Sequence, residues 1–278
     1  MVVGAVDADH SIDPKLIPQV AERVRGLAAD YQPPDFAEAP GADAALFLCA
    51  IDHRTGYARA HLVDGKGPYD GSDVLWALGC TAERRRTGLL SAASLSAVDA
   101  ERVEELFGVE EETIAGAEER ARLWRNLAAG LNERYEGSTV ALLTAAQSRL
   151  GGSEGLIERL AQFEAFGDPL AKKAYLFAKI AARRGWLEVV DPESWEVCAD
   201  NVLMRLALRS GLVQPGPVDA VRAATREALK RVAEEAGIEP PLLDDLLWEV
   251  GRDDADLLGT AGGADLREPP RPDGILWY

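Results

Sequence analysis

Two lysines and one aspartate lie where the sequence predicts that helices begin. Lys172 and Lys173 follow the tight turn Gly167-Asp168-Pro169, and Asp200 precedes the helical pattern 201–209. Asp is preferred at a helix N-cap, which would fix its carboxylate. A cation at a helix start opposes the helix dipole, which favours a phosphate- or substrate-facing role for Lys172. An ordinary cap and a solvated charge are the alternative interpretations.

The order of these features resembles the helix-hairpin-helix base-excision N-glycosylases. A helix ends in Phe163-Glu164-Ala165-Phe166, a hairpin turn follows, and then come Lys172 and, later, Asp200. The resemblance implies that the lysine and the aspartate face one another across the scissile glycosidic bond. Breaking a C1′–N bond builds oxocarbenium charge on the sugar, which an ionised carboxylate stabilises or attacks. The resemblance therefore implies catalytic roles for Lys172 and Asp200.

Within that superfamily, the stretch from about 46 to 213 resembles the queuosine salvage family of nucleotide N-glycosylases. The matching segments are Glu118-Glu119-Arg120-Ala121-Arg122, 131–138, Lys172-Lys173-Ala174, Ala199-Asp200, 243–248 and the closing Trp277-Tyr278. The resemblance implies an enzyme that hydrolyses queuosine 5′-phosphate and releases free queuine. The family's K-x-A spacing assigns the lysine to Lys172 rather than to its neighbour. No cofactor is expected.

The family's aromatic Asn-Phe-x-Phe-Trp-like element is reduced here to Phe47, with Asp52 and His53 close behind it. The two polar residues would replace lost stacking by polar contacts, which suits a different or smaller nucleobase. A planar base needs flat apolar walls and a few polar groups. We therefore expect Phe47 and His53 to line a pocket beside Asp200, with Asp244 closing it. A structural role for His53 is the alternative.

Further substrate-binding candidates lie on the helices expected near the C-terminal end of the sequence. Asp244 matches a family position, and its carboxylate suits the secondary ammonium of the queuine side chain, although an acidic solvated face would look the same. The other candidates are Asn201, Arg205 and Trp248. Arg205 and Arg222 either reach a phosphate or pair with the excess carboxylates.

The net charge of the chain limits which partners it is expected to bind. The chain of 278 residues has a formal net charge of −17, whereas a domain that grips duplex DNA is usually basic. Duplex DNA is therefore disfavoured, and a small nucleotide is the expected substrate. A DNA glycosylase with Lys172 as Schiff-base nucleophile and Asp200 assisting is the second hypothesis, and a non-catalytic nucleotide-binding module is the third. The oligomeric state is left open.

Cysteine and histidine usage predicts no metal site. The sequence has three widely spaced cysteines, no CxxC and no histidine pair at ligand spacing. These cysteines are typical of reduced core residues in a cytoplasmic protein. The N-terminus lacks the pattern of a signal peptide, and no apolar run approaches 18 residues. We expect a cytoplasmic protein without a membrane partner.

The periodicity is helical almost throughout, which predicts an all-α fold with at most a small strand pair near 46–63. One domain is expected over 1–278, with an N-terminal helical segment at 1–40 and a docked tail at 262–278. The expected helices are 70–78, 99–107, 117–134, 138–150, 153–163, 170–184, 200–209, 218–236 and 240–250, besides one that opens near Pro14.

Overall fold

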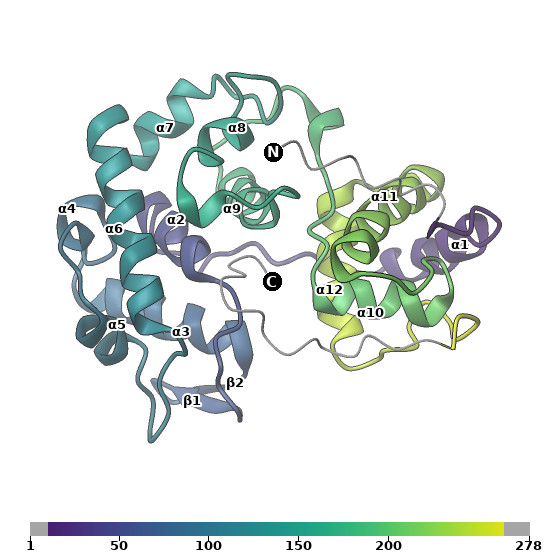
Figure 1. The fold of residues 1–278 in the computed structure, drawn as a ribbon, viewed down its shortest axis with the longest axis horizontal. Helices are drawn as coiled ribbons and strands as arrows, with labels where there is room; N and C mark the ends of the chain where they lie inside the picture. The colour runs from purple at the N-terminus through teal and green to yellow at the C-terminus, as the bar shows by residue number, and fades with distance from the viewer. Residues whose placement is uncertain (1–10, 264–278) are drawn as a thin grey trace. The chain divides into compact units, whose positions relative to one another are not determined.

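The computed structural model describes residues 11–263, and Figure 1 shows how helices dominate them. Within this range there is one sheet, which has two strands. The predicted all-α class with a small strand pair is therefore confirmed. No helix between residues 11 and 263 has the length and apolar character needed to cross a membrane.

The described residues divide into two compact units. The central unit comprises residues 35–194, and the split unit comprises residues 11–34 together with 195–263. In Figure 1 the split unit contains α1, in dark purple, and α10 to α12, in green to yellow. The predicted single domain over 1–278 stays a prediction. Residues 1–10 and the predicted docked tail from 264 onward lie outside the described residues.

The central unit holds most of the elements, and their bounds follow in chain order. They are α2 (Ala42–Ile51), β1 (His61–Val63), β2 (Lys66–Tyr69), α3 (Gly71–Arg85), α4 (Ala92–Leu95), α5 (Ala100–Leu106), α6 (Ala117–Arg134), α7 (Thr139–Ala145), α8 (Leu156–Leu160), the 3-10 helix η2 (Glu164–Phe166), α9 (Lys172–Arg183) and the 3-10 helix η3 (Pro192–Ser194). The strands pair antiparallel, with His61 opposite Tyr69 and Val63 opposite Lys66.

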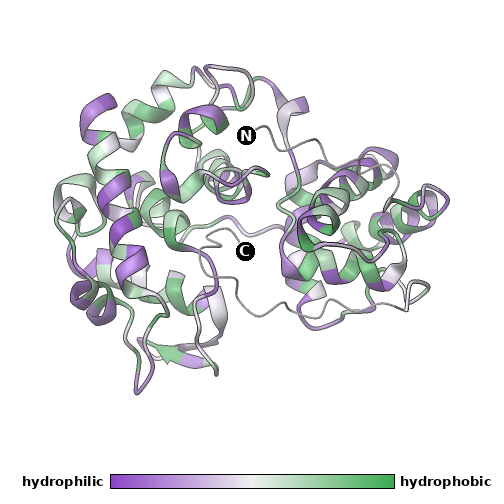
Figure 2. Cartoon of the chain, in the orientation of Figure 1, coloured by the Kyte–Doolittle hydropathy of each residue, from purple (hydrophilic) through white to green (hydrophobic). Residues whose placement is uncertain are grey.

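The split unit is built from four helices. They are α1 (Ile17–Ala28), α10 (Asn201–Ser210), α11 (Val218–Ala236) and α12 (Pro240–Gly251). α1 packs against α11 and α12, although about 190 residues separate it from α11 along the chain. Figure 2 shows hydrophilic and hydrophobic residues around the same helices, as expected where one side of each helix is buried.

The apolar run 44–51 forms the buried helix α2 and contributes no strand. Every side chain from Ala44 to Ile51 is buried, because α3, α6, α7 and α9 all pack against α2. A helix that is apolar on all sides has no helical period to reveal it, so the sequence did not distinguish it from a buried strand. The strands begin later, at His61.

Gly79 lies inside α3 and does not end it, which corrects the predicted helix 70–78. A Cβ on Gly79 would overlap the side chain of Leu48 in α2. The glycine is therefore needed where two helices approach closely, and α3 runs on to Arg85.

Three other predicted helices are shorter than expected. α7 ends at Ala145 and α8 covers only Leu156–Leu160, with turns between them. α9 starts at Lys172, two residues after the predicted start, because the chain first turns through Ala171. By contrast, α6 and α11 have the predicted bounds, and Asp99 and Asp200 are N-caps as their residue types indicate.

Candidate active site

A tight turn leads into α9 and is held by Asp168. Its Oδ1 accepts the N–H of Leu170 at 3.0 Å, and its Oδ2 accepts the N–H of Lys172 at 2.9 Å. Ala171 is the N-cap and has a φ of 51°, in the left-handed region that non-glycine residues rarely adopt. The carboxylate thus replaces a conventional cap and fixes where the lysines of α9 begin.

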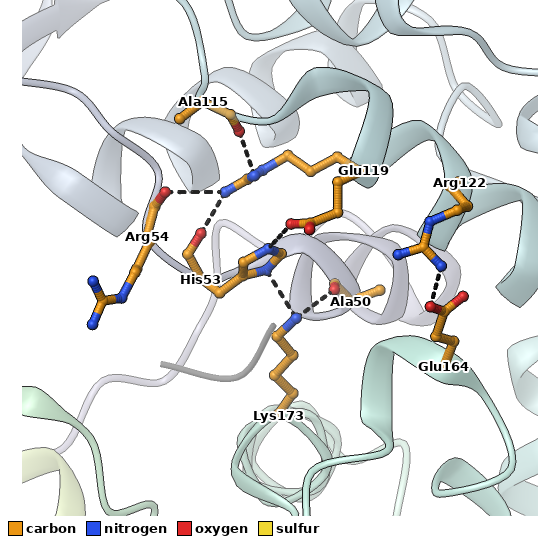
Figure 3. Close-up of polar contacts among 9 residues, drawn as sticks. Ala50, His53, Arg54, Ala115, Glu119, Arg122, Glu164 and Lys173 are labelled. Carbon is orange, nitrogen blue, oxygen red and sulfur yellow. Dashed lines mark hydrogen bonds and ion pairs between the residues drawn. The ribbon is translucent and has the colours of Figure 1, made fainter. Parts of the chain in front are cut away.

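Lys173 is the buried lysine of the pair. Its side chain has an exposed fraction of 0%, and its Nζ donates to the carbonyl oxygen of Ala50 at 2.7 Å. Nζ also lies 2.9 Å from Nδ1 of His53. Burial holds the pKa of the Lys173 amine well below its usual value of 10.5, and the charge of Lys172 acts in the same direction. Figure 3 shows Lys173 reaching from α9 to the end of α2.

His53 connects this amine to α6. Its Nε2 lies 3.1 Å from Oε1 of Glu119, whose side chain is 34% exposed, whereas the His53 side chain is 3% exposed. Arg120, beside Glu119, donates to the carbonyl oxygens of His53 and Ala115. The backbone after α2 is therefore fixed by a buried guanidinium while the imidazole bridges two helices (Figure 3).

Asp52 is buried and bound to α3. It accepts a hydrogen bond from Ser72 Oγ at 2.5 Å and another from Trp76 Nε1 at 3.1 Å. Asp52 and His53 are both buried, so neither points into solvent. Their substrate contacts, expected from the sequence, stay predictions, because the structure shows them bound to protein groups.

Lys172 lies at the first position of α9 and is half-buried. Its backbone N–H binds Asp168, and its ammonium has no hydrogen bond or ion pair with any residue between 11 and 263. A charge at that position is available to bind an anion. The predicted role of Lys172 is compatible with this placement and stays a prediction.

Phe47 belongs to the core of the central unit, not to an accessible wall. Its ring is 0% exposed and packs edge-on against Trp124, with centroids 6.5 Å apart. The indole N–H of Trp124 also donates to the Phe47 carbonyl oxygen at 2.7 Å. Phe47 is therefore a core residue packed within the central unit, and its expected contact with a base stays a prediction.

Asp200 lies in the split unit and caps α10. Its Oδ1 accepts the backbone N–H of Val202 at 2.9 Å and that of Leu203 at 3.1 Å. The residue is 8% exposed. Two backbone donors therefore hold the carboxylate in one orientation.

Two buried charged residues hold the segment before Asp200. Oδ1 of Asp244 accepts the N–H of Cys198 at 3.0 Å, and Nε of Arg222 donates to the carbonyl oxygen of Ala199 at 3.0 Å. Arg222 thus donates to a backbone carbonyl oxygen, a contact that the sequence did not predict. The phosphate contact and the carboxylate pairing stay predictions. The structure gives Asp244 a backbone partner, and its predicted contact with a substrate ammonium stays untested.

The remaining candidates lie on α10 and α12. Asn201 follows Asp200, and its Oδ1 is buried without a hydrogen-bond partner among residues 11–263. Arg205 is half-buried one turn further along α10. Trp248 on α12 is half-buried beneath the guanidinium of Arg252, which lies 4.5 Å from the ring centroid. The predicted convergence of residues from both units on one cavity stays a prediction.

Lys173 and Glu119 are the two site residues that the sequence did not single out. One signal could have found the lysine: Lys173, Phe177 and Ile180 follow the spacing of a buried helix face, which places Lys173 on the packed side of α9. No comparable signal exists for the pairing of Glu119 with His53, because the two are far apart in sequence.

No group of three or more histidine, cysteine, aspartate or glutamate side chains within residues 11–263 could hold a metal ion.

No family model matches the sequence, and no curated protein matches it. Among solved structures, one similar chain is the 8-oxoguanine DNA glycosylase from Pyrobaculum aerophilum, determined in complex with 8-oxoguanosine. The two sequences are 20% identical, the match covers 86% of this chain and 81% of the glycosylase, and the TM-score is 0.48. Membership of the queuosine salvage family therefore stays a prediction.

Proposed function

We propose that this protein is a hydrolase that cleaves the N-glycosidic bond of a modified nucleotide. The observation that carries the proposal is the geometry of Asp200, a buried carboxylate held by the backbone N–H groups of Val202 and Leu203. A carboxylate fixed in this way is suited to stabilise positive charge without having to reorganise during the reaction.

The reaction breaks the bond between C1′ and the base nitrogen and forms a bond between C1′ and a water oxygen. The base leaves with the bonding electron pair and gains a proton, and the water loses one. Positive charge builds on the sugar as the bond lengthens, and Asp200 is the group that we assign to stabilise it. Lys172, a cation without an ion pair among residues 11–263, is assigned to the nucleotide phosphate.

The substrate we propose is queuosine 5′-phosphate, and the released base is queuine. Support comes from the sequence resemblance at Lys172-Lys173-Ala174 and Ala199-Asp200, and from the buried, unpartnered Oδ1 of Asn201 in the described structure, which a ligand donor would satisfy. We assign the activity to the cytoplasm, because Cys49, Cys80 and Cys198 are buried and form no disulfide, which suits a reducing compartment.

Asp200→Asn tests the catalytic role directly. Asn is as good an N-cap as Asp, so the variant should keep the fold and lose only the charge. We expect kcat for queuine release from queuosine 5′-phosphate to fall by about 10²- to 10³-fold, with a smaller change in KM. The matched control is Asp99→Asn, the same change at the exposed N-cap of α5, which should leave turnover unchanged. Near wild-type turnover in Asp200→Asn would end the assignment.

A covalent intermediate distinguishes a DNA glycosylase with a Schiff-base lysine from the proposed hydrolase. A Schiff base between a lysine amine and C1′ of DNA is trapped by borohydride, whereas hydrolysis by water leaves no adduct. With a damaged-base oligonucleotide and borohydride, we expect no trapped protein. An adduct that disappears in Lys172→Ala would favour the DNA enzyme instead. Saturable binding of queuosine 5′-phosphate without base release would favour the non-catalytic module.

A further inference from the structure

Lys173, His53 and Glu119 form a hydrogen-bonded triad inside the central unit, linking three helices that are distant in sequence. Nζ of Lys173 lies 2.9 Å from Nδ1 of His53, and Nε2 of His53 lies 3.1 Å from Oε1 of Glu119. Nζ also donates to the Ala50 carbonyl oxygen. The triad therefore connects the start of α9 to the end of α2 and to the first turn of α6.

The donors and acceptors of the triad are matched as long as Lys173 and His53 together carry no more than one mobile proton, because a neutral amine can still donate to Nδ1 and to the Ala50 carbonyl oxygen. With that proton on Nζ, the ammonium donates to Nδ1 and the neutral ring donates through Nε2 to the Glu119 carboxylate. If the proton moves from Nζ to Nδ1, the imidazolium donates a hydrogen bond through Nδ1 to the neutral amine. Nε2 still donates to Glu119. The net charge of the triad is zero in both forms, and both keep every hydrogen bond.

A second proton breaks this pattern. Nζ and Nδ1 would then both be protonated and would face one another as two donors and two positive charges 2.9 Å apart. Lys173 is 0% exposed and has no room to turn its ammonium to water. The contact between Nζ of Lys173 and Nδ1 of His53 must therefore open, whereas the bond between Nε2 and Glu119 is retained.

Other charged groups face the triad and make its further protonation easier or harder. Those facing Lys173 are Lys172 on the same helix, Asp52 and Cys49 from the end of α2, and Arg120 on α6. The two cations oppose further protonation, and the charge of Asp52 favours it. The helices α8 and η2 also pack against α9, where Arg159 and Glu164 pair with Glu154 and Arg122. The charges of Lys172 and Arg120 therefore make a second proton less favourable, and the charge of Asp52 acts against them.

We propose that Lys173, His53 and Glu119 are positioning residues: with at most one shared proton they hold the start of α9, and a second proton releases it and with it Lys172. The effect on turnover rests on the proposed function, because it acts through Lys172. The proton-linked opening itself needs no substrate and is tested separately.

The first test follows the His53 ring by nitrogen-15 NMR across pH. Glu119→Gln removes the carboxylate that stabilises the imidazolium, so the midpoint of the His53 titration should move to lower pH by about one unit. Lys173→Met removes the neighbouring amine, so the midpoint should move to higher pH. Glu118→Gln is the matched control, because Glu118 precedes Glu119 on α6 but is exposed and pairs with Arg125. Shifts in the same direction, or no difference between the two glutamine variants, would overturn the proposal.

The second test measures queuine release as a function of pH. We expect the acid limb of kcat/KM to move to lower pH in Glu119→Gln by the same amount as the His53 midpoint, and to stay unchanged in Glu118→Gln. A purely structural role of Glu119 would lower the rate without moving the limb, and that result would remove the link to Lys172. If no substrate is hydrolysed at any pH, the proposed function fails, and the NMR titration alone decides on the triad.

Discussion

The segment that delivers Asp200 is held at its backbone by buried charges. Asp244 accepts the N–H of Cys198, and Arg222 donates to the carbonyl oxygen of Ala199, so two consecutive residues before the cap are held from α12 and α11. A buried N–H without an acceptor costs about 1–3 kcal/mol. Buried charge next to Asp200 therefore supports the orientation of the carboxylate.

Replacing Asp244 should separate this structural role from substrate binding. Asp244→Ala leaves the Cys198 N–H without its acceptor, and we expect the free energy of unfolding to fall by about 1–3 kcal/mol in urea titrations. Asp244→Asn keeps an acceptor oxygen and should retain most of that stability. A stable Asp244→Asn protein with a greatly raised KM would instead show that the carboxylate binds the substrate ammonium.

Single residues were predictable from the sequence where their role is local. Asp200 was identifiable as a cap because a cap binds the next few residues of the same chain. The helical spacing of Lys173, Phe177 and Ile180 indicates that Lys173 is the buried lysine, but its pairing with His53 was not predictable, because the two residues are 120 positions apart. The burial of Phe47 was not predictable for a related reason, since it depends on Trp124, which lies 77 positions away.

Among the helices, the contact between α2 and α3 depends on the absence of one side chain. Gly79 lets Leu48 pack closely, and the helix continues through the glycine despite its low propensity. The helix predicted from length and periodicity ended too early. In sequence, a glycine that ends a helix looks the same as one that lets a neighbouring helix approach. α6 and α11, which contain no such conflict, were predicted with their observed bounds.

We expect Gly79→Ala to lower the free energy of unfolding by about 1–3 kcal/mol, because the added methyl group overlaps Leu48. Gly26→Ala is the matched control: it lies in α1 with no atom within 4 Å of the added Cβ. There the higher helix propensity of alanine should stabilise by about 0.5–1 kcal/mol. Urea unfolding of both variants measures the difference, and a stabilising Gly79→Ala would contradict the packing role.

Asp191 ties the turn after α7 to the irregular segment that follows α9. It accepts the N–H of Leu150 at 2.8 Å and that of Gly151 at 2.9 Å, and Ser194 Oγ at 3.0 Å. Burial acts to raise the pKa of Asp191, but these donors outweigh it and the pKa is lowered. A carboxylate with a lowered pKa stabilises the fold above its unfolded pKa and loses that contribution as pH falls through the folded value.

Asp191→Asn should therefore destabilise the protein near neutral pH, by about 1–3 kcal/mol, because an amide cannot accept from all three donors. The difference from wild type should shrink as pH falls below the unfolded pKa of about 3.8 and through the lower folded value. Glu193→Gln, at an exposed neighbouring position, is the control and should show no such convergence. Unfolding curves at several pH values measure the effect, and a difference that does not vary with pH would refute it.

For the whole molecule, the net charge of −17 sets the behaviour toward polyanions. Duplex DNA binding gains most of its affinity from counterion release by cationic side chains, and many arginines here pair with carboxylates within the protein. We expect no saturable binding to a labelled duplex in fluorescence anisotropy at about 50 mM salt. Binding with a steep salt dependence would show a basic surface strong enough to outweigh the net charge.

The division of the split unit has a consequence for the order of events during synthesis. α1 precedes the whole of residues 35–194 on the ribosome, yet its packing partners α11 and α12 follow them. The central unit can therefore complete its contacts while α1 still lacks its own. Closing so long a loop is slow, and segments that wait for distant partners keep apolar side chains such as Val20 and Val24 uncovered meanwhile. The first helix of the described chain to be translated is thus among the last to be buried.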